Sequence, residues 1–292
     1  MALRAKKPQD CTQRLKLLLS GPAGVGKTMA SIQMPKPYVI DTERGCAHYG
    51  PMIEKSGGMV FEPVDMNDII LEVRSLLTEK HDFRTLVIDP ITTVYHALGD
   101  EGERKVGTEF QKHYKMYADK FVRRLLGLLT ILDMNVVMTA HSKNLWGKVI
   151  KDGKEEPTII GETFDGYAKL DYVFDLYLQL DKDRKTGKRF ARVAKTRFGE
   201  FPDMDQFEWS YQELAKRFGK DRLEKGSVTI KLATADQVQK FNFLLAQIGE
   251  DGQKALKIDK VLATVENIAD LPAERIAKGI ALMEQHAAAL AA

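Results

Sequence analysis

The chain has 292 residues, of which 44% are hydrophobic and 29% charged, and it carries a formal net charge of +3. This composition is typical of a soluble globular protein, and the length suits one α/β domain of about 220 residues with a smaller appendage. No apolar run approaches the roughly 20 residues of a membrane helix, and residues 1–10 lack the apolar core of a signal peptide. We therefore expect a cytoplasmic protein without a membrane partner. The positions of Cys11 and Cys46 match no metal or redox motif, and the small net charge does not by itself indicate a polyanionic partner.

The strongest motif lies near the N-terminus, directly after the apolar run 15–19, which we expect to form a buried strand. Strand, glycine-rich loop and short helix in this order are typical of a P-loop, because glycines let backbone N–H groups approach phosphate oxygens. Lys27 is expected to reach the β- and γ-phosphates, and the Thr28 hydroxyl is placed to ligate Mg²⁺. The predicted nucleotide-binding residues are Gly21, Pro22, Ala23, Gly24, Val25, Gly26, Lys27, Thr28 and Met29.

Beyond the P-loop, apolar runs alternate with segments of helical periodicity. Further strands are expected at 38–40, 59–62, 85–89 and 135–140. Helices are expected at 67–80 and 108–132. This order predicts an α/β fold with a mainly parallel central sheet.

The later part of the chain predicts an antiparallel strand pair, 172–180 with 190–195, around the turn 183–188. The polar stretch 144–161 is too long for an ordinary connection, so it predicts a functional or mobile loop. From residue 227 the pattern changes to short helices, expected at 234–248, 254–265 and 272–285. We therefore divide the chain into a core, residues 1–226, and a small helical C-terminal domain, residues 227–292.

Several predicted strands end in polar residues at the same edge of the sheet, where parallel α/β sheets bind ligands. Asp89 follows an apolar strand, which is the Walker B pattern of an acid that positions Mg²⁺. Pro90 follows it, so the residue that activates water must come from elsewhere. Glu43 is the candidate base and Asp41 its rival.

Two further positions have candidate roles in catalysis. His141 ends the strand at 135–140 and is placed to sense the γ-phosphate, although it could also satisfy backbone groups at a strand end. Lys195 and Arg197 end a late strand, where they form salt bridges or project into the nucleotide of a neighbouring subunit. The second role requires an oligomer.

Together, the P-loop, the segment 38–45, the strand ending at Asp89 and the strand ending at His141 resemble the RecA-like ATPase core. The segment 38–45 is similar to the second strand of Rad-type recombinases, in which the glutamate is catalytic. Residues 195–199 resemble the Lys-x-Arg-x-Gly element of RadA- and DnaB-like proteins, whose basic residues act across a subunit boundary. The resemblance spans about residues 12–212 and is greatest to phage-encoded, short RecA-like single-strand-annealing recombinases.

This resemblance implies ATP with Mg²⁺ as the cofactor, binding of single-stranded DNA, assembly into a homo-oligomeric ring or filament, and cooperation with a single-strand-binding protein. It implies annealing or strand exchange in the cytoplasm of a bacterial host, by a phage- or prophage-encoded protein. Two departures from the pattern are Pro90 after the Walker B acid and His141, where many relatives have Gln or Asn.

In RecA-like proteins, the segments after the Walker B strand and after the sensor strand bind DNA; here they are residues 92–117 and 144–161. Lysines there would neutralise phosphates and an aromatic ring would stack on bases, but both segments also contain acids, as an ordinary solvated loop does. The DNA-binding candidates are Arg104, Lys105, Lys143, Trp146, Lys148 and Lys151. The alternatives are a ring helicase or translocase of the DnaB-like type, and a nucleotide-gated loader or regulator that binds a protein partner.

Overall fold

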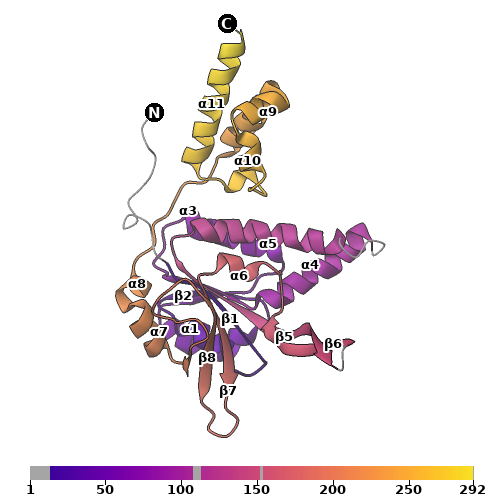
Figure 1. Cartoon of the computed structure of the whole chain (residues 1–292). Helices are drawn as coiled ribbons and strands as arrows, with labels where there is room; N and C mark the ends of the chain where they lie inside the picture. The colour runs from indigo at the N-terminus through magenta and orange to yellow at the C-terminus, as the bar shows by residue number, and fades with distance from the viewer. Residues whose placement is uncertain (1–13, 108–112, 152–153, 292) are drawn as a thin grey trace. The chain divides into compact units, whose positions relative to one another are not determined.

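The computed structural model describes residues 14–107, 113–151 and 154–291. Their backbone divides into two compact units, each described separately below (Figure 1). The described residues of the first unit lie within 14–66, 82–118 and 133–227, and those of the second lie within 67–81, 119–132 and 228–291.

The first unit is built on one nine-stranded sheet with the main strand order β3-β2-β4-β5-β1-β7-β8-β9. The parallel strands are β1 (Lys16–Gly21), β2 (Pro37–Asp41), β3 (Met59–Phe61), β4 (Thr85–Asp89), β5 (Asn135–Lys151) and β7 (Leu176–Lys182). Antiparallel pairing adds β8 (Arg189–Thr196) to β7, β9 (Gln206–Glu208) to β8, and β6 (Lys154–Phe164) to β5. β1, β2 and β4 are apolar runs buried along almost their whole length, as expected for parallel strands covered on both faces. The predicted α/β fold with a mainly parallel sheet is confirmed, as are the helices at the C-terminus.

The helices of the first unit are α1 (Lys27–Ile32), η2 (Gly45–Tyr49), α2 (Gly50–Lys55), α4 (Ile91–Val106), α6 (Leu170–Val173), α7 (Tyr211–Phe218) and α8 (Lys220–Glu224). The second unit contains nearly all of α3 (Met66–Thr78), most of α5 (His113–Ile131), α9 (Ala235–Ala255), α10 (Ile258–Leu262), η3 (Ile268–Asp270) and α11 (Ala273–Ala291). In the part of the chain that the structure describes, no helix is both long enough and apolar enough to cross a bilayer.

The segment after β4 differs from the prediction, which placed a DNA-facing segment there and one helix over 108–132. The structure has two helices instead, α4 and α5, and residues 108–112 lie outside the described part. α4 escaped detection because its buried face includes Thr92 and Gly102, which give a weak apolar periodicity. Packing explains the glycine at position 102, since a Cβ there would lie 2.8 Å from the Tyr114 carbonyl oxygen.

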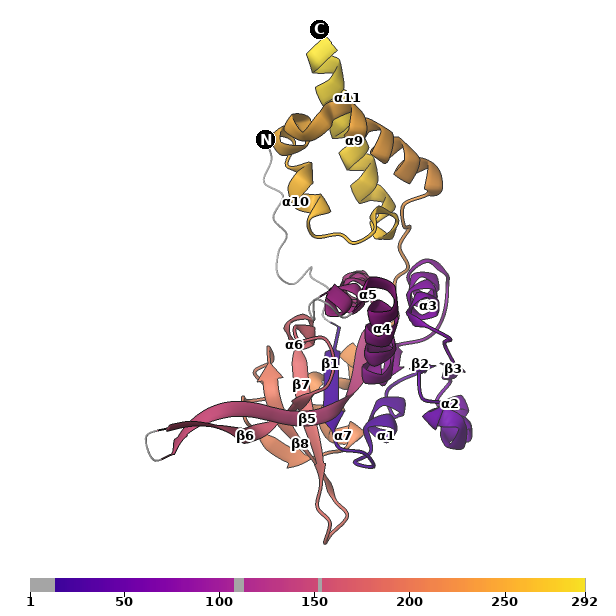
Figure 2. The same ribbon diagram turned by 90° about the vertical axis from the view of Figure 1, so that its right-hand side faces the viewer.

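The stretch 144–161 is also not a loop. β5 continues past the sheet and pairs with β6 as a two-stranded antiparallel ribbon that extends away from the sheet (Figure 2). The register shifts between Leu145 and Trp146, which marks a bulge. The predicted strand pair around 183–188 is confirmed as β7 and β8.

In the second unit, α9 and α11 pack together around an apolar cluster that includes Phe241, Leu244, Ile276 and Met283. A capping box begins α9: the Thr234 hydroxyl accepts from the Gln237 backbone N–H, and the Gln237 side chain accepts from the Thr234 N–H. The helix is interrupted at Gly249, near the break predicted from the sequence.

Asp270 joins three segments of this unit that are distant in sequence. Its carboxylate, only 10% exposed, accepts hydrogen bonds from Arg74 on α3 and from Arg124 on α5, the latter at 2.6 Å. A neighbouring pair, Arg123 with Glu266, is more exposed. The carboxylate of Asp270 therefore fixes the turn before α11 to helices from the middle of the chain.

We expect the substitution Asp270→Ala to destabilise the second unit by roughly 2–4 kcal/mol, because it leaves two half-buried arginines without their carboxylate. Glu266→Ala is the matched control and should cost at most about 1 kcal/mol, since its pair is solvent-exposed. Amide hydrogen exchange in α9 and α11 measures both changes. Equal protection in the two variants would contradict the role assigned to Asp270.

Candidate nucleotide site

The glycine-rich loop connects β1 to α1 at the carboxyl edge of the sheet. Gly24 has a φ of +74° and Gly26 a φ of +100°, left-handed conformations that favour glycine. The Lys27 ammonium donates to the carbonyl oxygens of Gly21 at 2.8 Å and Pro22 at 3.0 Å. Burial lowers the pKa of Lys27, while the nearby carboxylates of Asp89 and Glu43 oppose this shift. The strand, glycine-rich loop and short helix that the sequence predicts are therefore present in the structure.

Asp89, at the end of β4, lies beside the loop because only β5 separates β4 from β1. Its carboxylate is 5% exposed and accepts from the hydroxyls of Thr139 and Thr28. Burial raises the pKa of Asp89, and these two hydrogen bonds partly counteract the shift. The side chains predicted to hold the metal, Thr28 and Asp89, are therefore adjacent.

This pair fits a magnesium ion that arrives with a nucleotide. Mg²⁺ typically binds one or two protein oxygens, with phosphate oxygens and waters as its other ligands. Among the described residues, no cluster of three or more His, Cys, Asp or Glu side chains could hold a metal alone. Thr28 and Asp89 would thus hold the ion only together with phosphate, as their hydroxyl and carboxylate chemistry allows.

The two rival bases have different environments. Asp41 is 2% exposed, and its carboxylate accepts from the backbone N–H groups of Glu43, Gly45 and Cys46 at 3.2, 3.1 and 2.7 Å. Its role is to shape the turn into η2. The Glu43 side chain is 43% exposed, accepts from the Thr93 hydroxyl at 2.5 Å and lies 3.2 Å from His141 Nε2. This geometry favours Glu43 over Asp41 as the base, a role that stays a prediction.

These groups surround one cavity of about 310 Å³. It brings together the predicted Lys27, Thr28, Glu43, Asp89 and His141. Its other lining residues are Ala23, Gly24, Gly26, Met29, Tyr49, Pro90 and Arg189.

Residues 13–200 match the protein-family model described as "AAA domain". This range includes all of the described residues that line the cavity. The chain belongs to the AAA domain family. It is therefore a P-loop nucleotide-binding protein. A curated adenylosuccinate synthetase from Geobacter sulfurreducens is 29% identical over 161 residues, which are 50% of this chain and 37% of that protein. The chain thus spans well under half the length of this relative.

Two solved structures are similar to this AAA domain protein. The RadB recombinase is 19% identical, with a TM-score of 0.42 over 68% of this chain and 87% of that one. The KaiC-like protein PH0186 from Pyrococcus horikoshii OT3 is 15% identical, with a TM-score of 0.41 over 66% of this chain and 84% of that one.

His141 in the AAA domain is also connected to the base of the β5–β6 ribbon. Its backbone N–H donates to the Thr92 hydroxyl at 2.9 Å, and that hydroxyl donates to the Asp165 carbonyl at 2.7 Å. The Asp165 carboxylate accepts from His96 at 2.8 Å and from Lys143 at 3.0 Å. Burial disfavours its charged form, but the hydrogen bonds and the electrostatic interactions with His96 and Lys143 together hold the pKa of Asp165 below its usual range. Sequence reasoning missed Thr92, His96 and Asp165, which belong to no motif.

Arg189 is a second omission of the sequence analysis. It begins β8 after a turn rich in lysine and arginine, where nothing in the sequence distinguishes it. Its Nε donates to the Val25 carbonyl at 2.9 Å, which places the side chain on the P-loop of the AAA domain.

Lys195 and Arg197 are not part of the cavity of their own chain. In the strand registers, Thr196 lies opposite Leu176 and Leu176 opposite Leu17, so the end of β8 is level with the amino end of β1. The P-loop follows the other end of β1, roughly 13 Å further along the strand. Lys195 donates to the carbonyls of Asp171 and Phe174, and Arg197 pairs with Asp175 at 2.8 Å. The cross-subunit role of these cations stays a prediction.

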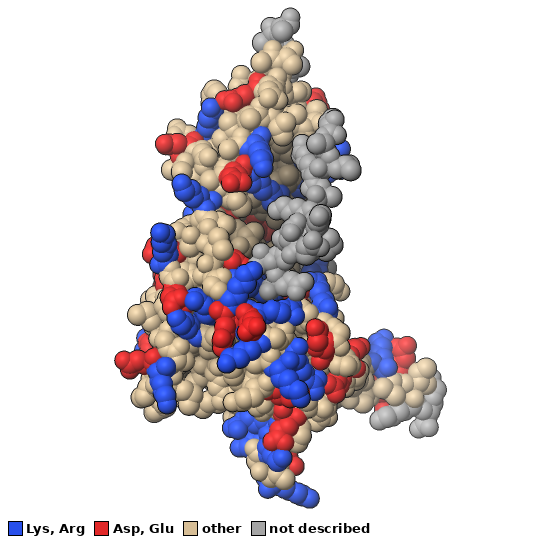
Figure 3. Space-filling view, turned by 90° about the vertical axis from the view of Figure 1, so that its left-hand side faces the viewer, with Lys and Arg blue, Asp and Glu red and all other residues tan. Residues whose placement is uncertain are grey.

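The DNA-binding candidates lie on two elements. Arg104 and Lys105 are on α4, where Lys105 pairs with Glu101 at 2.5 Å. On the ribbon, Lys143 pairs with Asp165, Lys148 pairs with Glu155 at 2.7 Å, Trp146 is 62% exposed, and Lys151 ends β5. Figure 3 shows basic and acidic side chains intermingled on the face of the first unit that it presents. On this face, charge alone therefore does not mark a path for nucleic acid.

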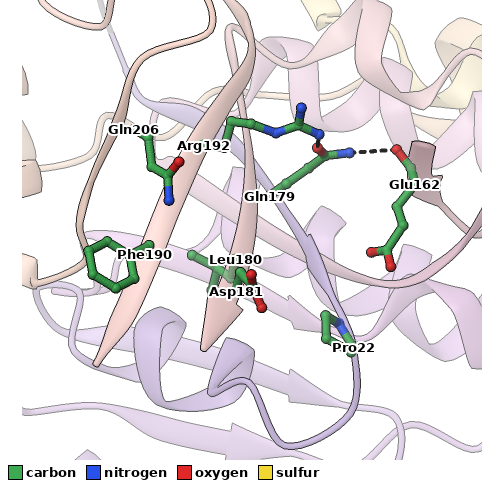
Figure 4. A pocket seen from close by; sticks show the side chains of 8 residues that line it. All are labelled: Pro22, Glu162, Gln179, Leu180, Asp181, Phe190, Arg192 and Gln206. Atoms are coloured by element: carbon green, nitrogen blue, oxygen red, sulfur yellow. Dashed lines mark hydrogen bonds between the residues drawn. The ribbon is translucent and has the colours of Figure 1, made fainter. Parts of the chain in front are cut away.

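A second cavity, of about 280 Å³, lies beside Pro22 (Figure 4). Arg192 donates to the Gln179 side-chain oxygen there, and the Gln179 amide donates to the Glu162 carbonyl at 2.8 Å. Among the described residues, its lining includes the carboxylates of Glu162 and Asp181 and one cation, Arg192. This charge balance suits a triphosphate less well than the P-loop cavity does.

We expect Glu43→Gln to bind ATP about as tightly as the wild type and to hydrolyse it on the order of a hundredfold more slowly, because the amide cannot accept a proton from water. Steady-state phosphate release and titration with a fluorescent ATP analogue measure the two properties separately. Glu54→Gln, at an exposed position on α2, is the control and should change neither. Wild-type turnover by Glu43→Gln would exclude Glu43 as the base.

Proposed function

We propose that this protein is an ATP-hydrolysing recombination protein of phage type, which binds single-stranded DNA as a homo-oligomer and promotes annealing or strand exchange. The observation that carries the proposal is the contact between Glu43 and His141 beside Lys27 and Asp89. A phosphate-binding loop alone indicates nucleotide binding. A carboxylate held at the same cavity supplies the group that hydrolysis needs.

In the proposed reaction, Lys27 binds the β- and γ-phosphates and the P-loop backbone orients them. Thr28 and Asp89 would hold a Mg²⁺ ion that arrives with the nucleotide, and the ion would supply positive charge to the phosphate oxygens. Glu43 orients water and accepts its proton, while the Thr93 hydroxyl and His141 fix the direction of the carboxylate. His141 senses the γ-phosphate through the same contact.

The ribbon supports the single-stranded DNA part of the proposal. Its exposed apolar side chains include Trp146, Ile150 and Ile160, which is an unusual concentration for a two-stranded element in water. An exposed indole offers a stacking surface of about 1–3 kcal/mol per base, whatever the base. β5 leads directly from His141 to Trp146, so the ribbon is covalently continuous with the γ-phosphate sensor.

The oligomeric part of the proposal depends on Lys195 and Arg197. They lie at the opposite end of β1 from their own P-loop, so any nucleotide that they contact would belong to a neighbouring copy. Arg197 remains 56% exposed in its pair with Asp175. An arginine at that position could supply positive charge to the transition state of a neighbouring site.

We expect the wild type to bind a fluorescent single strand more tightly with a non-hydrolysable ATP analogue than without it, and less tightly as salt rises. Trp146→Ala should weaken binding roughly tenfold, because one stacking surface is lost. Phe243→Ala, an equally exposed aromatic on α9, is the control and should bind normally. Flat fluorescence anisotropy for the wild type under all conditions would reject DNA binding and favour the loader or regulator. Rapid DNA-stimulated turnover with strand separation would favour the helicase.

If Arg197 completes the site of the neighbouring subunit, a mixture of two inactive variants should regain ATPase activity. Arg197→Ala and Glu43→Gln should each lose most ATPase activity, but in a mixture a Glu43→Gln subunit can provide Arg197 to an Arg197→Ala neighbour. With random mixing in equal amounts, about a quarter of head-to-tail interfaces contain both intact residues. The mixture should therefore release phosphate at about a quarter of the wild-type rate. Normal hydrolysis by Arg197→Ala alone, in oligomers of normal size, would reject the role of Arg197.

A further inference from the structure

Arg189 contacts the P-loop through its side chain, and its backbone is fixed by a hydrogen bond next to the β8–β9 pair. Its Nε donates to the Val25 carbonyl, and its own carbonyl accepts from the Trp209 N–H at 2.8 Å. A Cβ at Gly26 would lie 2.5 Å from Arg189 Nε. Glycine at this position therefore leaves room for an arginine side chain as well as for phosphate.

The side chain also borders two cavities. One is the P-loop cavity, and the other, of about 230 Å³, lies between α1 and residues 208–212. Both are lined by Gly26, Met29 and Arg189, but Lys27, Thr28 and Asp89 line only the first. Arg189 thus lies on the side of the site away from the predicted metal ligands.

A bound nucleotide would bring negative phosphate charge into the P-loop cavity, so a second cation besides Lys27 would stabilise it. Among the described residues that line the P-loop cavity, Lys27 and Arg189 carry full positive charge, and they face the carboxylates of Glu43 and Asp89. Lys27 is bonded to the carbonyls of Gly21 and Pro22, and Arg189 to that of Val25. Phosphate oxygens accept stronger, charge-assisted hydrogen bonds than neutral carbonyls do, and the bond to Val25 uses one of five N–H groups on the guanidinium.

We propose that Arg189 is a nucleotide-binding residue of its own chain, which contacts the α- and β-phosphates of a nucleotide held by the P-loop. The proposal rests on the proposed function in one respect, that the P-loop binds a nucleotide. The γ-phosphate end of the site is marked by Lys27 and the metal ligands. The border position of Arg189 therefore places it at the phosphates nearer the nucleoside, and it contributes equally to the binding of ATP and ADP.

The test compares Arg189→Met, which keeps an unbranched apolar stem, with Arg192→Met on the same strand. The Arg192 guanidinium bonds Gln179 in the separate cavity beside Pro22 (Figure 4). The affinities are measured by calorimetric titration with Mg²⁺ and either ADP or a non-hydrolysable ATP analogue. Arg189→Met should bind both ligands roughly tenfold or more weakly, and the factor should be the same for the two. Arg192→Met should bind both like the wild type. Arg189→Lys should recover part of the loss, because the charge is restored without the fork.

Three results would overturn the assignment. The first is undiminished binding of both ligands by Arg189→Met. The second is a much larger loss for the ATP analogue than for ADP, which would place the side chain at the γ-phosphate. The third is an equal loss in the Met and Lys variants with a lowered unfolding midpoint in the absence of nucleotide, which would mean that Arg189 only packs the loop. Absence of binding by the wild type would instead reject the proposed function itself.

Discussion

The hydrogen bond from the Thr139 hydroxyl to Asp89 is the contact on which the candidate site depends. It crosses from β5 to β4 in the buried sheet, and Thr28 from the P-loop donates to the same carboxylate. A buried carboxylate needs such donors, because removal from water disfavours its charge. Three segments that are distant in sequence therefore meet at one acid. Its position fixes where a metal ion and the phosphates can lie.

Around that acid, four strands reach the same edge of the sheet, and each contributes a different functional group. These strands are β1, β2, β4 and β5. β1 leads to the loop, β2 to Glu43, β4 to Asp89 and β5 to His141. Asp41 organises the turn after β2 by accepting three backbone N–H groups, which turns Glu43 toward His141. The buried acid, Asp41, has a structural role, and the neighbouring exposed acid, Glu43, is the one that we propose as the base.

Much of this site could be predicted from the sequence, because strands with near-continuous apolar runs and polar ends identify a parallel sheet and its binding edge. Lys27, Thr28, Glu43, Asp89 and His141 were found in this way and line one cavity. Arg189 could not be found, since it reaches the loop only through the pairing of β7 and β8, at a sequence separation of 164 residues from Val25. Helix α4 was missed because its buried face contains Thr92 and Gly102. The ribbon was missed because Gly147, Pro157 and Gly161 interrupt its apolar residues, as they do in loops.

β5 is one uninterrupted strand from Asn135, in the sheet, to Lys151, at the end of the ribbon. From His141 to that end the chain extends roughly 33 Å. If this span moved as one body, the hydrogen-bonded group of His141, Thr92 and Asp165 would be its fulcrum. A tilt of about 5° at the fulcrum displaces the tip by roughly 3 Å. A small rearrangement beside His141 would in that case become a larger one at the end of the ribbon.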